Sequence, residues 1–104
     1  MKEISINPEH MEWEEFVGYP QGTRICVLRT DENGMVRSFL LRSGPDFTVG
    51  GHVNTTSEQQ LVLEGEIQSG EKTFGRGSYR FIPRGGSHER WTCGEGAVLF
   101  VTWD

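Results

Sequence analysis

Apolar and polar residues follow each other in short runs along this chain, and turn residues separate the runs. Residues 24–30 (Arg-Ile-Cys-Val-Leu-Arg-Thr) are rich in β-branched and apolar side chains and predict a strand. Residues 31–34 (Asp-Glu-Asn-Gly) follow it, and an Asn-Gly pair between two apolar runs is a strong hairpin signal. We therefore expect a β-hairpin with its return strand over residues 35–43.

The rest of the chain repeats this pattern of short strands and turns. Residues 1–15 are mostly polar and predict either an edge strand or a short helical turn. No helix-length 3.6-residue period is present, and turn signals about every 8 to 12 residues are typical of an all-β sandwich or barrel. The further expected strands are residues 47–49, 58–69 with a bend at Gly65, 73–74, 79–83, 88–93 and 97–103.

Length and composition are those of one small β-rich domain. The chain has 104 residues, of which 14 are glycine and 35% are hydrophobic. A chain of this size builds a single core, and many glycines suit tight connections between short strands. We expect one domain over residues 1–104.

Charge and hydropathy exclude two classes of partner. The formal net charge is −5 and the basic residues are scattered, whereas nucleic-acid binding needs a positive surface. No apolar run approaches the ~18 residues that a membrane span requires, and the polar start is not typical of a signal peptide. We expect a cytoplasmic protein without a nucleic-acid or membrane partner.

The two cysteines, Cys26 and Cys93, predict no disulfide framework. They do not form a Cys-x-x-Cys pair, so a thiolate zinc site is not indicated. Each falls in an expected strand, where a buried thiol acts as a small apolar residue. Both are expected to be free.

Two histidine-bearing blocks carry the candidate chemistry. The first holds His52, Asn54 and Glu58, and the second ends at His88. Alternate residues of a strand share a face, so His52 and Asn54 are expected to point the same way. Neighbouring antiparallel strands lie ~4.8 Å apart, which brings ligands from several strands to one point. Two imidazoles and one carboxylate suit Fe(II), Zn, Ni or Mn, so we predict one divalent metal ion.

Each of these residues also has an ordinary role. A lone histidine at a strand end is most often a hydrogen-bonded residue, and an isolated Glu58 would be a solvated carboxylate. The joint spacing from His52 to His88 favours the metal site. Asn54 either ligates through its amide oxygen, which is a weak ligand beside imidazole, or stands behind a water molecule.

The two blocks resemble the two sequence motifs of the cupin family. Motif 1 (about residues 50–65) is matched by the spacing of His52, Glu58 and Gly65, and motif 2 (about 77–92) by Gly77, Pro83, Gly85 and His88. Asn54 replaces a histidine of motif 1, and Thr92 replaces the last asparagine of motif 2. The resemblance implies a double-stranded β-helix, or jelly-roll barrel, with His52, Asn54, Glu58 and His88 as metal ligands.

Within that family, the chain is similar to the zinc-binding cupin domain of ChrR-type anti-sigma factors. Residues 61–66 (Leu-Val-Leu-Glu-Gly-Glu) and 77–83 (Gly-Ser-Tyr-Arg-Phe-Ile-Pro) carry this likeness. The sequence contains no sigma-binding helical domain, so anti-sigma activity is not carried over. Cupins include dioxygenases, isomerases, lyases and non-catalytic binders, and a shared fold does not choose among them.

We therefore expect a metal-dependent enzyme on a small organic acid or diketone, or alternatively a non-catalytic metal or small-ligand binding or sensing module.

Strand alternation predicts Gln60 and Val62 on the face of Glu58, and Arg90 and Thr92 on the face of His88. Gln60 and Arg90 are the catalytic candidates. Arg90 either binds an anionic substrate group or pairs with a loop carboxylate. Exposed N-terminal edge strands predict a homodimer.

Overall fold

The computed structural model describes residues 2–49, 52–53, 55–88 and 90–104. For Val49, His52, Val53, Ser87 and His88 it describes the backbone alone. No helix in these ranges is long and apolar enough to cross a membrane.

The described residues form one short 3₁₀ helix and otherwise strands, which confirms the all-β prediction. The N-terminal region contains both structures that its sequence left open, a helical turn and an edge strand. Residues 24–30, 47–49 and 97–103 form strands with the expected bounds. The elements are η1 (Pro8–His10), β1 (Glu14–Glu15), β2 (Arg24–Thr30), β3 (Val36–Arg42), β4 (Phe47–Val49), β5 (His52–Val53), β6 (Glu58–Gly65), β7 (Ile67–Ser69), β8 (Lys72–Phe74), β9 (Tyr79–Ile82), β10 (Ser87–His88), β11 (Trp91–Cys93) and β12 (Ala97–Trp103).

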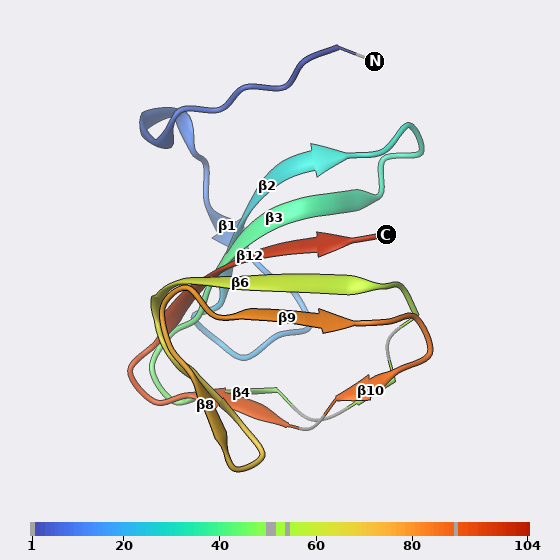
Figure 1. The fold of residues 1–104 in the computed structure, drawn as a ribbon. Helices are drawn as coiled ribbons and strands as arrows, with labels where there is room; N and C mark the ends of the chain where they lie inside the picture. Colours follow the sequence, from blue (N-terminus) through green and yellow to red (C-terminus); the bar gives the residue numbers. More distant parts are fainter. Residues whose placement is uncertain (1, 50–51, 54, 89) are drawn as a thin grey trace.

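The strands form two antiparallel sheets and a small separate ladder. One sheet has the order β1-β2-β3-β12-β6-β9, the other has the order β4-β11-β7-β8, and β10 pairs with β5. Figure 1 shows the larger sheet above β4, β8 and β10. Over the described residues, the edge strands β1, β9, β4 and β8 each have a single ladder partner, so the sheets do not close into a hydrogen-bonded barrel. Over the described residues, the expected closed barrel is therefore not observed. The two packed sheets that were also expected are present.

The hydrophobic core lies between the two sheets. In β12 the side chains of Ala97, Leu99 and Val101 are buried, while the alternate positions are more exposed. Fully burying a large apolar side chain contributes about 1.5–3 kcal/mol, so this alternation fixes which face of each strand points inward. The core cluster contains Ile25, Phe39, Leu41, Phe47, Val62, Ile67, Trp91, Cys93, Ala97, Leu99 and Val101.

Both cysteines are free and buried, as expected. Cys93 belongs to the core cluster. Burial raises the pKa of the Cys93 thiol, and a hydrogen bond with Ser43 partly offsets this effect. The protonated thiol therefore packs as an apolar residue.

The predicted hairpin joins β2 to β3, and the side chain of Asp31 organises its turn. The Asp31 Oδ1 atom accepts hydrogen bonds from the backbone N–H groups of Asn33 at 2.8 Å and Met35 at 3.0 Å. Its Oδ2 atom accepts a hydrogen bond from Arg37 Nε at 3.0 Å. The N–H of Met35, followed by that of Asn33 and by the Arg37 guanidinium, lowers the pKa of Asp31. The carboxylate form therefore stabilises the turn.

We expect Asp31→Ala to destabilise the protein at neutral pH. A carboxyl group with a lowered folded-state pKa contributes stability that is present above its unfolded pKa and lost as pH falls through the folded value. The difference between wild type and Asp31→Ala should therefore shrink below about pH 4, the ordinary aspartate range. Urea unfolding at a series of pH values measures it. A difference that is constant from pH 7 to pH 2 would contradict this role.

Candidate functional site

The backbone brings the two predicted histidine positions opposite each other. In the β10–β5 ladder, His88 is the register partner of His52, and Ser87 is the partner of Val53. This pairing joins the first histidine block to the second. Asn54, the fourth predicted ligand, lies outside the described residues.

Glu58, the predicted carboxylate ligand, begins β6 and is half-buried. Its Oε1 atom accepts a hydrogen bond from the indole Nε1 of Trp103 at 2.7 Å, and its Oε2 atom accepts one from the amide of Gln60. A carboxylate has about four acceptor positions. Two neutral donors thus orient the carboxylate and leave acceptor capacity unused.

Gln60 connects Glu58 to a cation that the sequence prediction missed. Gln60 is 3% exposed, and its register partner on β9 is Arg80. Arg80 Nη1 lies 3.5 Å from Gln60 Oε1, and Nη2 lies 3.5 Å from Ser69 Oγ on the opposite sheet. The guanidinium carbon is 5.1 Å from the ring centroid of Phe74. The Arg80 side chain therefore spans the space between the two sheets.

Burial and the negative charge of Glu58 shift the pKa values of Arg80 and Tyr19. Burial lowers the pKa of the Arg80 guanidinium, and the negative charge of Glu58 partly offsets this. Burial, with a smaller effect of Glu58, raises the pKa of the Tyr19 phenol. Tyr19 stacks on Phe16 with the ring centroids 4.2 Å apart. Glu58 is therefore the negative centre of a half-buried polar cluster of Glu58, Gln60, Arg80, Trp103 and Tyr19.

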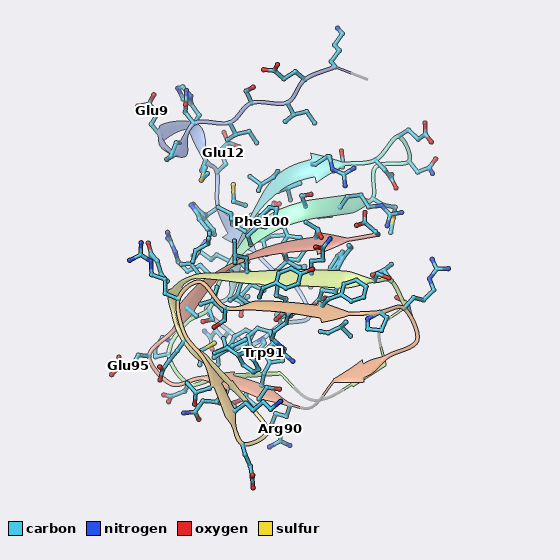
Figure 2. The ribbon with its side chains drawn as sticks, in the orientation of Figure 1. Glu9, Glu12, Arg90, Trp91, Glu95 and Phe100 are labelled. Atoms are coloured by element: carbon cyan, nitrogen blue, oxygen red, sulfur yellow. The ribbon has the colours of Figure 1, made fainter. Side chains whose placement is uncertain are left out.

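The expected inner face of β6 is confirmed, because Gln60 and Val62 are both buried. The expected inner face at Arg90 and Thr92 is wrong. The predicted strand over residues 88–93 is divided into β10 and β11, so alternation does not carry from one to the other. In β11 it is Trp91 and Cys93 that are buried. Arg90 is exposed, and Figure 2 shows it at the periphery of the molecule.

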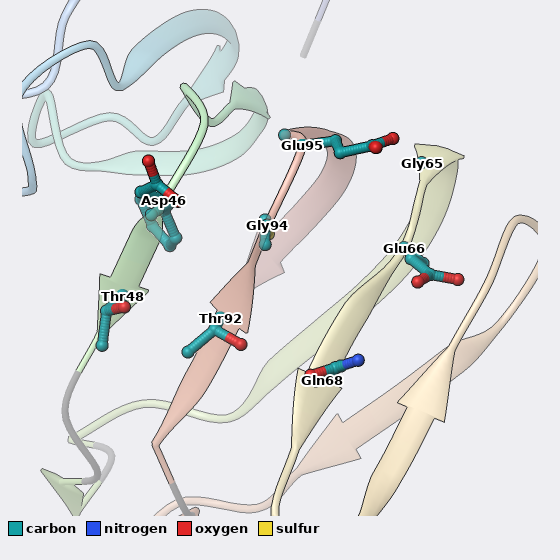
Figure 3. Close-up of a pocket in the computed structure, with 11 residues that line it drawn as sticks. Asp46, Thr48, Gly65, Glu66, Gln68, Thr92, Gly94 and Glu95 are labelled. Atoms are coloured by element: carbon teal, nitrogen blue, oxygen red, sulfur yellow. The ribbon is translucent and has the colours of Figure 1, made fainter.

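Thr92 instead lines a depression at one end of the smaller sheet (Figure 3). Its volume is about 530 Å³, and its lining includes the acidic residues Asp46, Glu66 and Glu95. Glu58, the predicted ligand whose side chain the structure describes, is not among the residues that line it. The depression is thus separate from the Glu58 cluster.

The donor types fit a transition metal. Two imidazoles and one carboxylate with further open positions suit Fe(II), Zn, Ni or Mn. Among the side chains that the structure describes, no three His, Cys, Asp or Glu residues come together as ligands. The described part of the predicted set is the Glu58 carboxylate, which has unused acceptor capacity in a half-buried position.

Comparisons with known proteins give the same fold. A chain of acetylacetone dioxygenase from Acinetobacter johnsonii superposes with a TM-score of 0.78 at 14% identity, covering 99% of this chain and 73% of that one. An RmlC-like cupin from Shewanella frigidimarina gives 0.75 at 20% identity, covering 99% and 90%. A chain from the complex of Rhodobacter sphaeroides SigE with the anti-sigma ChrR gives 0.71 at 22% identity, covering 94% of this chain and 51% of that one.

No protein with a curated description matches the sequence. The sequence profile of the ChrR cupin-like domain, in contrast, matches residues 1–103, nearly the whole chain. The resemblance inferred from the two motifs is thereby confirmed, as is the jelly-roll fold. The chain belongs to the ChrR cupin-like domain family.

Proposed function

We propose that His52, Glu58 and His88 bind one divalent metal ion, with Asn54 as a fourth ligand or behind a bound water. The observation that carries this proposal is the register pairing of His88 with His52 in the β10–β5 ladder. Directly opposed residues of an antiparallel pair have Cβ atoms about 4.5–5.5 Å apart. That spacing is compatible with two imidazoles ligating one ion.

The surroundings of Glu58 support its role as the anionic ligand. Its hydrogen-bond donors, Trp103 and Gln60, are both neutral. Among the described residues it forms no salt bridge. The nearby Arg80 is separated from the carboxylate by the Gln60 amide, so a directly bound metal cation would offset the remaining cost of removing the carboxylate from water.

We propose further that the metal site serves an enzyme acting on a small organic acid or diketone. When bound, the ion would supply a Lewis acid or a site for O₂. Among the chain's own residues, Trp103 and Gln60 hold the Glu58 carboxylate in one orientation by hydrogen bonds. An acetylacetone dioxygenase shares this fold, so the fold is compatible with this class of reaction without selecting it.

A non-catalytic binding or sensing module is the second candidate, and the family match favours it. The chain belongs to the ChrR cupin-like domain family, and one structural relative is from a complex of SigE with the anti-sigma ChrR. A catalytic site keeps at least one exchangeable coordination position, whereas a structural site is closed. Coordination by exchangeable water therefore separates the two candidates.

Elemental analysis tests the proposal, on protein purified without a chelator or a nickel affinity tag. We expect about one divalent ion per chain, consistent with a single three-residue ligand set. For the metal-loaded protein, water-proton relaxation with Mn(II) in the site measures exchangeable water. Rapidly exchanging water supports the enzyme, and its absence supports the binding module. Protein that holds no stoichiometric metal, even after addition of Zn, Fe, Ni or Mn, would refute the metal site.

We also propose that the chain forms a homodimer, with a second copy on the β9 edge of the larger sheet. Tyr79 and Phe81 of β9 are 56% and 54% exposed, and β9 has one ladder partner among the described residues. An unpaired edge with exposed aromatic side chains favours association. Sedimentation at micromolar concentration should show a dimer, and Phe81→Ser should shift it toward monomer. A wild-type monomer would refute this part.

A further inference from the structure

We propose that Arg80 binds the anionic group of the ligand, so that the site selects small carboxylates over neutral molecules of the same shape. This inference rests on the proposed metal-binding function and assigns its ligand class. It replaces Arg90, which is exposed and outside the strands.

The donors of Arg80 are incompletely used. A guanidinium carries five N–H donors, and the hydrogen bonds of Arg80 to Gln60 and Ser69 are both 3.5 Å long, well beyond the usual 2.7–3.2 Å. Among the described side chains, no carboxylate lies within 4.0 Å of it. Because an ion pair with the cation becomes stronger away from water, this half-buried guanidinium is suited to a carboxylate, which it can bind through two parallel hydrogen bonds.

Gln60 lies between the Arg80 guanidinium and the Glu58 carboxylate and carries no charge that would neutralise Arg80. One end of the Gln60 amide donates to Glu58, and the other end faces Arg80. The Gln60 amide contacts both groups, and Glu58 and Arg80 do not form an ion pair with each other. An anion on Arg80 would therefore lie one amide group away from Glu58, the proposed carboxylate ligand of the metal.

Binding of matched acids and amides to the metal-loaded protein tests this assignment. The probes are acetate, malonate and benzoate, each compared with its amide by isothermal titration calorimetry. We expect wild type to bind at least one acid, and to bind the matching amide at least about tenfold more weakly. Arg80→Gln should weaken acid binding by about 10- to 100-fold, the range of a hydrogen bond between charged groups. Arg80→Lys should recover it partly, because a lysine lacks the planar fork.

Arg90→Gln is the matched control, and it should bind the acids as wild type does. Metal content, measured in every variant, should be unchanged in Arg80→Gln. Equal binding of acids and amides by wild type, or wild-type affinity in Arg80→Gln, would overturn the assignment. If Arg80→Gln lost both the metal and acid binding, the assignment of Arg80 to the anion would also be overturned. The proposal of a metal site would not be contradicted by that result.

The same measurements distinguish failure of the metal proposal from failure of the Arg80 assignment. If wild type holds no metal while Arg80 still discriminates acids from amides, the metal proposal fails and the anion site remains. If Arg80→Gln does not fold, the comparison of wild type with Arg80→Lys still tests the assignment. The Arg80→Lys protein should bind acids more weakly than wild type and still bind them more tightly than amides. Identical affinities in these two proteins would contradict a bidentate contact.

Discussion

His88→Ala is expected to abolish metal retention and to lower the melting temperature. His88 is the register partner of His52, and removing one imidazole leaves one nitrogen ligand and one carboxylate. A ligand at one hundred times its Kd stabilises the folded state by about 2.7 kcal/mol. Loss of that amount corresponds to roughly 10 °C or more in a domain of this size. Metal analysis and thermal unfolding measure the two effects.

The matched control is His10→Ala, because His10 is exposed in η1 and belongs to no motif. This variant should retain both the metal and the wild-type melting temperature. Chelated wild type should melt at the temperature of His88→Ala. His88→Ala protein that is folded and still holds one ion would show that His88 is not a ligand.

Asn54→His tests the same ligand set in the opposite direction. Imidazole is a stronger ligand than an amide oxygen for these metals, so the variant should bind the ion more tightly than wild type. Competition with a coloured chelator compares the two proteins. Weaker binding in a folded variant would remove Asn54 from the position assigned to it.

The second large effect is expected for Gly65→Ala, at the bend between β6 and β7. Gly65 has a φ of +73°, and a Cβ there would collide with the carbonyl oxygen of Gly96 and lie 3.1 Å from Ala97 Cα. The left-handed conformation costs an alanine about 1–2 kcal/mol, and displacing two backbone groups adds to this. The variant should lose at least about 2 kcal/mol of unfolding free energy, measured in urea.

Gly77→Ala is the matched control within the other motif. Its φ is +88°, but a Cβ at this position meets no atom within 4 Å. It should therefore lose only the conformational cost of about 1–2 kcal/mol. Equal losses at Gly65 and Gly77 would contradict a steric role for Gly96.

Much of this fold could be predicted from local sequence. The strands β2 and β12 have dense runs of β-branched and apolar residues, and the turn signals on either side set their bounds. The bend at Gly65 was expected because glycine adopts a positive φ without steric cost. The arrangement of the strands in two separate sheets depends on contacts between distant strands, which no local pattern contains.

Strand alternation predicted the inward-facing positions around the candidate site only in part. It was right for Gln60 because β6 is continuous from Glu58. It was wrong for Arg90 and Thr92 because the chain leaves β10 before β11 begins, which resets the inward-facing positions. Arg80 was missed, although it shares a face of β9 with the buried Ile82. The same alternation, applied to β9, would have indicated it.

Anomalous diffraction at the absorption edge of the metal identified by elemental analysis tests the central claim most directly. Crystals of protein purified without a chelator should show one strong peak per chain. We predict that this peak is bounded by the imidazoles of His52 and His88 and by the Glu58 carboxylate, at about 2.0–2.2 Å from their donor atoms. A peak elsewhere, or side chains of these three residues that point apart, would contradict the account.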